Sequence, residues 1–264
     1  MAAAEFAHLL KTWRHKRRLS QLDLALSTGV SQRHLSFLES GRANPSRGMI
    51  LQLSEALDVP LRERNLWLNA AGFAPVFQSR ALDHPQMSQI LTAVSMMLSN
   101  HEPFPAAAID RAWNVRLSNG AFDRLSAFLG EDVWTAVGGG ERNIMRLFFH
   151  PRGIRPWVTN WPSIAPLLWR RAEREAEAHA GREMKQVLEE LRPYQDTATL
   201  GQAEDAGLLP VLPLRCEKDG LRLSLFTVIA TFGTPQDVTA DELRIESLFP
   251  ADAETERFLR GAAD

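Results

Sequence analysis

The sequence contains a single cysteine, Cys216, and no long uninterrupted run of apolar residues. One cysteine excludes an intramolecular disulfide and any metal site built from several thiolates, and it fits a protein of the reducing cytoplasm. A segment that crosses a bilayer needs ~18 consecutive apolar residues, and no stretch of this chain approaches that length. We therefore expect no membrane partner.

The common signatures of catalysis and of cofactor binding are also missing. The chain has no HExxH motif, no P-loop and no GxGxxG after a predicted strand. Its seven histidines are scattered, which fits buried or surface positions better than metal ligation. No nucleophile elbow is visible, although a Ser/His/Asp triad assembled from distant positions stays open. We expect a protein that is not an enzyme, with no metal and no cofactor.

Length and charge distribution favour two domains of different character. A chain of 264 residues is long enough for one or two domains. Residues 1–75 carry ten Lys and Arg against six Asp and Glu, whereas residues 76–264 carry twenty against twenty-six. A basic segment on an acidic body is typical of a nucleic-acid contact confined to one domain. The basic run Lys16–Arg18 also fits a solvated helix end.

Residues 1–75 predict five short helices. Apolar residues recur at helical spacing from Phe6 onward. Ser20 and Ser31 are suitable N-caps for the second and third helices, and Gly29 and Gly41 are suitable residues to end them. The fourth and fifth helices are expected over residues 48–57 and 61–71. Two short helices joined by a glycine-containing turn form a helix-turn-helix, and a plain helical bundle is the alternative.

The motifs within this segment follow a familiar order. They are the run Ser20–Ala25, then Gly29–Ser31, then Leu35–Arg42, and finally Pro45 and Leu57. In this order they resemble the XRE/Cro-type phage-repressor family. The resemblance covers the whole N-terminal segment and implies an all-α, lambda-repressor-like DNA-binding fold.

In a helix-turn-helix the second helix enters the major groove, and side chains at its N-terminal end face base edges. Arg33 can bond guanine through two hydrogen bonds, and Gln32 can bond adenine. The resemblance implies that Gln21 and Ser31, each at a helix N-terminus, meet phosphates. The predicted DNA-binding residues are Gln21, Ser31, Gln32, Arg33, His34, Ser36, Phe37, Arg42 and Asn44.

Three positions on the third helix have alternative interpretations. Phe37 fits a core residue as well as a contact to a thymine methyl group. His34 fits a simple surface histidine, and Glu39 fits an ion pair with a nearby arginine better than a DNA contact. One such domain covers only a half-site, so we expect a homodimer on a two-fold double-stranded DNA operator.

The stretch from residue 72 to residue 85 contains Gly72, Pro75 and Pro85 and has few strong periodic signals. It predicts a linker at residues 76–85, followed by a larger domain at residues 86–264. Within that domain, alternating apolar residues over 113–117 predict a strand, followed by a helix over 120–129. The segment Glu217–Gly220 lies between two apolar runs and predicts a hairpin turn. A capping box at Thr239 predicts a helix over 240–248, and another short helix is expected over 254–259.

Two groups of residues link the larger domain to a known family. Asp110, Val115, Asn119, Phe122 and Gly130, with Ala121 and Leu125, resemble the opening of a PAS fold. Together with Asn143–Pro151, Gly153–Pro156 and Asn160–Trp161, and with the upstream XRE-type segment, they resemble the MmyB-like ligand-binding domain of bacterial transcription regulators over roughly 85–260. The resemblance implies an α+β PAS-like fold with an antiparallel sheet, and a fatty acid in the pocket of some members.

We interpret the chain as a ligand-responsive transcription regulator whose larger domain binds a small apolar molecule. The expected lining is Trp113, Phe122, Phe148, Phe149 and Phe226, with Arg146 or His150 anchoring a polar head group. Each aromatic residue fits a solid core equally well, and Arg146 fits a surface position. One alternative is a constitutive DNA binder whose larger domain only dimerises or docks a protein partner. An enzyme with an appended DNA-binding domain would need titratable residues that converge in one cleft.

Overall fold

The computed structural model describes residues 2–130, 132–178, 182–195 and 210–261. The chain forms two compact units, which are described separately below. The smaller unit comprises residues 1–80 together with 234–241, and the larger comprises 81–233 together with 242–264. No helix in the described ranges is both long enough and apolar enough to cross a membrane.

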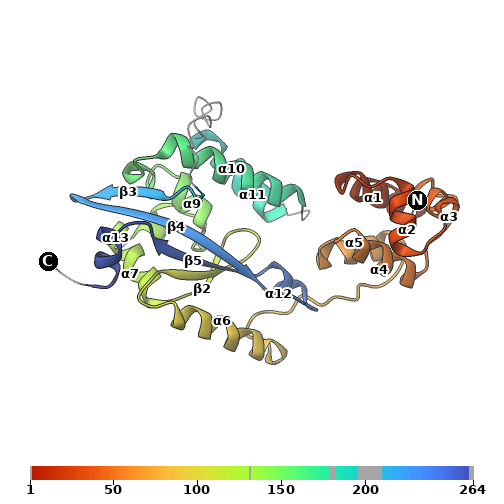
Figure 1. Cartoon of the computed structure of the whole chain (residues 1–264), viewed down its shortest axis with the longest axis horizontal. Helices are drawn as coiled ribbons and strands as arrows, with labels where there is room; N and C mark the ends of the chain where they lie inside the picture. Colours follow the sequence, from red (N-terminus) through yellow and green to blue (C-terminus); the bar gives the residue numbers. More distant parts are fainter. Residues whose placement is uncertain (1, 131, 179–181, 196–209, 262–264) are drawn as a thin grey trace. The chain divides into compact units, whose positions relative to one another are not determined.

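The smaller unit is built from helices, as the sequence predicts. Its helices are α1 (Ala2–Lys16), α2 (Gln21–Thr28), α3 (Gln32–Glu39), α4 (Arg47–Ala56) and α5 (Leu61–Ala70), drawn in red to orange in Figure 1. Ser20 caps α2 through a complete capping box, and Ser31 and Ser46 cap α3 and α4. Fully buried side chains from every helix share one core, which includes Phe6, Leu24, Leu35, Leu53 and Trp67. This core fixes α2 and α3 against each other.

Residues 234–241 also belong to the smaller unit, although they lie far along the chain. The Asp237 carboxylate accepts a hydrogen bond from the Arg80 guanidinium at 2.7 Å. The Asp241 carboxylate accepts one from the backbone N–H of Leu61, at the start of α5, at 3.0 Å. These contacts join α5 and the segment that follows it to residues 234–241.

The larger unit is an α+β domain around a sheet of five described strands, which agrees with the predicted fold class. The strands lie in the order β2-β1-β5-β4-β3, and every neighbouring pair is antiparallel. They are β1 (Ala106–Ile109), β2 (Val115–Ser118), β3 (Leu214–Lys218), β4 (Leu221–Thr231) and β5 (Arg244–Pro250). The α-helices are α6 (Ser88–Asn100), α7 (Gly120–Leu129), α8 (Val133–Ala136), α9 (Ile144–Phe149), α10 (Trp161–Ala178), α11 (Arg182–Leu191), α12 (Val238–Glu242, mostly in the smaller unit) and α13 (Ala253–Leu259). Short 3-10 turns are η1 (Pro85–Met87), η2 (Arg155–Trp157) and η3 (Arg192–Tyr194).

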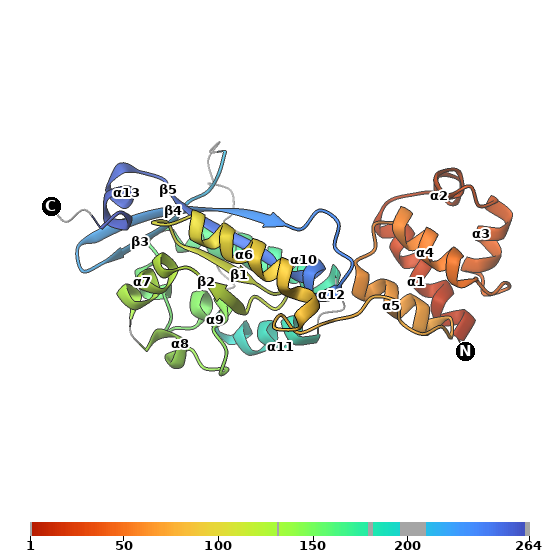
Figure 2. The same ribbon diagram turned by 90° about the horizontal axis from the view of Figure 1, so that it is seen from below.

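Side chains that alternate along the strands give the sheet two apolar faces. Ala106 and Ala108 pack toward α6 in a small cluster with Val94 and Ile245, and Figure 2 shows α6 lying across this face. The residues that alternate with them, Ala107 and Ile109, face the other side of the sheet and pack with Phe122 of α7. The largest core, with α9, α10 and α11, lies on that second side.

The hairpin prediction is confirmed, and one helix prediction is wrong. Asp219 and Gly220 form the two-residue turn between β3 and β4, with φ of 53° and 82°, which suits a type I′ turn. The helix expected over 240–248 does not form, because α12 ends at Glu242 and residues 244–250 are strand β5. β5 pairs with β1 on one side and β4 on the other. These non-local hydrogen bonds outweigh the capping signal at Thr239.

Candidate functional site

The α2-turn-α3 segment presents one polar helix face. Gly29 has a φ of 67° at the end of α2, and the Ser31 hydroxyl accepts the His34 N–H at 3.2 Å to start α3. Leu35 and Leu38 are fully buried on the core side of α3. The opposite side is therefore left to polar residues. Exposed members of the predicted set are Ser31, Gln32, Arg33, Ser36, Arg42 and Asn44, and half-buried members are Gln21, His34 and Phe37.

A buried hydrogen-bond network joins α1, α2 and α3. Glu39 accepts two hydrogen bonds from Arg14, at 2.6 Å from Nε and 2.9 Å from Nη2, and one from Gln21 Nε2 at 2.8 Å. Burial alone would raise the pKa of Glu39, but the hydrogen bonds from Arg14 and Gln21 outweigh it and lower that pKa below its usual range. The predicted ion pair of Glu39 is thus confirmed. The Gln21 side-chain amide donates within the motif, and the Asp23 N–H donates to the capping hydroxyl of Ser20. The backbone N–H groups of Gln21 and Leu22 remain at the start of α2 as donors for a phosphate.

The first turn of α3 carries an arginine whose guanidinium lies over an aromatic ring. The guanidinium carbon of Arg33 lies 5.5 Å from the centre of the Phe37 ring, one helical turn further on. Stacking on an aromatic ring restricts the rotamers of an arginine without using its hydrogen-bond donors. Phe37 therefore has a supporting role beneath Arg33, while remaining half-buried.

A cavity of about 350 Å³ lies within the larger unit, between the sheet and helices α7, α9 and α10. Four of the five aromatic residues predicted to line a pocket do line it: Trp113, Phe122, Phe148 and Phe226. Most other lining side chains are aliphatic, including Leu125, Leu129, Met145, Leu223 and Leu225. Cys216 is among them, and burial raises the pKa of its thiol to about 12, so this group is neutral at physiological pH.

The structure does not bring the other three predicted ligand-binding residues to this cavity. Helix α9 turns Met145 and Phe148 toward it, which leaves Arg146 and Phe149 on other faces. Arg146 pairs with Glu190 at 2.7 Å, and Phe149 packs its ring against Trp161 and Trp169. The His150 ring lies 4.9 Å from that of Tyr194. Burial and the nearby Arg152 lower the pKa of His150.

Among the residues that the structure describes, the charged ones that line the cavity are Arg171 of α10 and Glu246 of β5, and neither was predicted from the sequence. Arg171 donates from Nε to Glu175 at 2.9 Å and from Nη2 to Glu246 at 3.1 Å. Glu175 also pairs with Arg244 at 2.6 Å. Burial alone would raise the pKa of Glu175, but Arg244 and Arg171 hold it below its usual range. The i, i+4 spacing of Arg171 and Glu175 suggests a solvated helix face, and nothing local reveals the partner 75 residues away.

Trp113 connects this charged network to the cavity wall. Its indole N–H donates to Glu175 at 2.7 Å, and its ring lies 4.6 Å from the guanidinium carbon of Arg171 and 5.3 Å from that of Arg244. The residue has a φ of 67°, a left-handed conformation that is uncommon outside glycine. Hydrogen bonds in the surrounding turn hold this backbone conformation.

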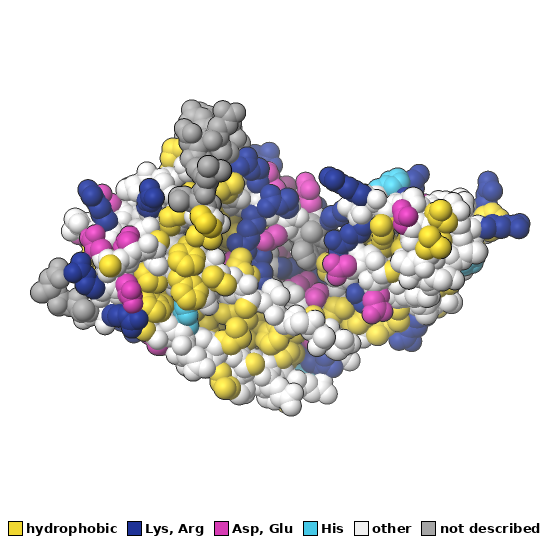
Figure 3. Space-filling view, viewed as in Figure 1, with side chains coloured by type: hydrophobic (Ala, Val, Ile, Leu, Met, Phe, Trp, Pro, Cys, Tyr) yellow, Lys and Arg dark blue, Asp and Glu magenta, His cyan; other side chains and the backbone are white. Residues whose placement is uncertain are grey.

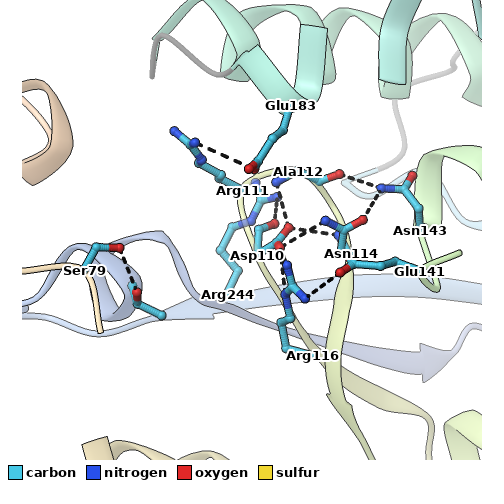
Figure 4. Close-up of polar contacts among 11 residues, drawn as sticks. Ser79, Asp110, Arg111, Ala112, Asn114, Arg116, Glu141, Asn143, Glu183 and Arg244 are labelled. Atoms are coloured by element: carbon cyan, nitrogen blue, oxygen red, sulfur yellow. Dashed lines mark hydrogen bonds and ion pairs between the residues drawn. The ribbon is translucent and has the colours of Figure 1, made fainter. Parts of the chain in front are cut away.

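The turn is held by Asp110 and Asn143 (Figure 4). The Asp110 carboxylate accepts hydrogen bonds from the backbone N–H groups of Ala112 and Asn114, at 2.8 and 3.0 Å, and from Arg116 Nε at 2.8 Å. The fully buried Asn143 side chain donates to the Ala112 carbonyl at 2.7 Å and to Asn114 Oδ1 at 2.8 Å. These bonds fix the backbone on both sides of Trp113.

Two family models match the chain, one over each part. A model described as the MmyB-like transcription regulator ligand binding domain matches residues 90–262. A helix-turn-helix model matches residues 10–64. No curated protein matches the chain.

Proposed function

The chain belongs to the MmyB-like transcription regulator ligand binding domain family, and on that premise we propose a regulator whose larger unit senses a small apolar molecule. The helix-turn-helix at residues 10–64 makes it a DNA-binding transcription regulator. The observation that carries the sensing proposal is the apolar cavity of about 350 Å³ inside the unit that matches the ligand-binding family. Natural ligand sites are mostly apolar pockets with a few polar groups.

On the DNA side, the proposed partner is a double-stranded operator. Arg33 and Gln32 are proposed to contact base edges, and Ser31 and the start of α2 to contact phosphates. Their exposure on α3 and its N-cap supports these roles. Because one helix-turn-helix covers a half-site, the protein is proposed to act as a homodimer in the cytoplasm.

On the ligand side, the family resemblance implies a fatty acid in some members, and a hydrocarbon chain of that kind fits the apolar lining of the cavity. A ligand alters DNA binding only if it binds one arrangement of the dimer more tightly than another. The proposed consequence is a change in the spacing of the two recognition helices on the operator.

A second candidate function is constitutive DNA binding, with the larger unit acting only in dimerisation or in docking of a protein partner. Apolar residues on the surface of this unit favour it: Val211, Val228 and Ile229 are all more than one-third exposed. Figure 3 shows hydrophobic side chains gathered over the larger unit in this view.

Native mass spectrometry of the purified protein separates these functions. Ligand sensing predicts an added mass that organic extraction removes, and a changed affinity for a selected operator duplex after extraction. The constitutive function predicts a monomer or dimer with no added mass. It also predicts the same operator affinity before and after extraction.

A further inference from the structure

The polar lining of the cavity is concentrated around Arg171. Among the described residues that line it, the only charged side chains are Arg171 and Glu246. Thr227 of β4 also lines it, and in the β4–β5 register it lies diagonally across from Glu246 on the same sheet face. The cavity therefore combines a hydrocarbon wall with a small polar region.

Within this region some hydrogen-bonding groups have protein partners and others do not. Arg171 uses Nε for Glu175 and Nη2 for Glu246, whereas no described residue accepts from its Nη1 group. The indole N–H of Trp113 is already committed to Glu175. Thr227 is exposed at this wall of the cavity, and its hydroxyl makes no hydrogen bond to a described residue. A bound molecule would thus find donors at Arg171 Nη1 and Thr227 Oγ1.

Both guanidinium groups of this region already have carboxylate partners. Arg171 and Arg244 are connected to Glu175 and Glu246 by ion pairs of 2.6 to 3.1 Å. An incoming carboxylate would place a second negative charge beside Glu246 and would compete with it for Arg171. A neutral acceptor gains the same hydrogen bonds without that electrostatic cost.

We propose that the cavity selects an uncharged amphiphile, with a hydrocarbon body and a hydroxyl or carbonyl head that hydrogen-bonds to Arg171 Nη1 and Thr227, over the corresponding carboxylate. The proposal rests on the proposed function, because it assumes that the cavity is a ligand site. A volume of about 350 Å³ lies at the small end of the range for ligand pockets, about 300–1,000 Å³, which suits a short-chain probe.

The test compares 1-decanol with decanoate on the extracted full-length protein at pH 8, where decanoate is ionised. Calorimetric titration below the aggregation limit of each probe should give a dissociation constant at least about tenfold lower for 1-decanol, because like charges placed together are strongly unfavourable. Tighter binding of decanoate would overturn this inference and leave the sensing function intact. Binding of neither probe would overturn both.

Two variants test which residues cause the preference for 1-decanol over decanoate. Glu246→Gln removes one negative charge, so it should raise decanoate affinity by about tenfold while changing 1-decanol affinity much less. Thr227→Val keeps the shape of the side chain and lies outside the ion-pair network. It should weaken 1-decanol binding by a few-fold and leave decanoate the weaker ligand. An unchanged ratio of the two affinities in Glu246→Gln would count against the charge argument.

Discussion

The Arg14 guanidinium on α1 holds the Glu39 carboxylate at the end of α3 through two hydrogen bonds, and both side chains are less than 10% exposed. Gln21 on α2 joins the same carboxylate. The orientation of the predicted recognition helix therefore depends on a contact made at its far end, away from the side chains that are proposed to read DNA.

Glu39→Ala should destabilise the smaller unit by about 3 kcal/mol, because it leaves the Arg14 charge buried without its partner. The free energy of unfolding from urea titration measures this loss. Glu55→Ala, at an exposed position on α4, is the matched control and should have a small effect. Equal effects of the two variants would show that the buried pair adds no specific stability.

The same carboxylate should make stability depend on pH. The pKa of Glu39 is lower in the folded state than its usual value near 4.5. Its contribution is therefore fully present above that value and is lost as the pH falls through the folded-state pKa. Thermal unfolding between pH 7 and pH 3 should show a smaller acid-induced loss for Glu39→Gln than for the parent protein. Parallel curves for the two proteins would contradict this assignment.

Arg33→Ala should relax operator preference at one base position and cost about 1–3 kcal/mol at that position. The measurement is selection from a randomised duplex, followed by competition binding at fixed salt. Lys11→Ala removes one exposed positive charge from α1 and should preserve the preferred sequence. A parent-like preference in Arg33→Ala would remove Arg33 from the set of base-reading residues.

Asp110→Ala should destabilise the larger unit by about 2 kcal/mol, because two backbone N–H groups and Arg116 lose their acceptor. The left-handed conformation at Trp113 then loses its support, so tryptophan fluorescence should also change. Asp123→Ala, whose partner Arg142 is also on the surface, is the control for loss of an exposed ion pair. Identical stability of Asp110→Ala and the parent would contradict a supporting role for the turn.

Local signals predicted the parts of the fold that local interactions determine. The capping serines Ser20 and Ser31 start α2 and α3, and the Asp219-Gly220 pair forms the β3–β4 turn, because each acts through atoms a few residues away. The strand at 244–250 was missed because its hydrogen bonds go to β1 and β4, which are distant in sequence.

The lining of the cavity was predicted in part for the same reason. Large apolar residues such as Trp113 and Phe148 tend to be buried whatever their neighbours in the sequence. A prediction based on aromatic residues therefore found part of the cavity lining. The polar region depends on Arg171 meeting Glu246, and the pairing of residues so far apart requires the sheet register. Arg146 has the charge of a head-group anchor, but the helical phase of α9 directs it to Glu190.

The participation of residues 234–241 in the helical unit bears on how this protein can be recombined. A chimaera that exchanges only the first eighty residues for those of another repressor would separate Arg80 from Asp237 and the Leu61 N–H from Asp241. The loop between β4 and β5 would have to be grafted along with the helices. The helical unit of this protein is thus encoded by two separate stretches of the chain.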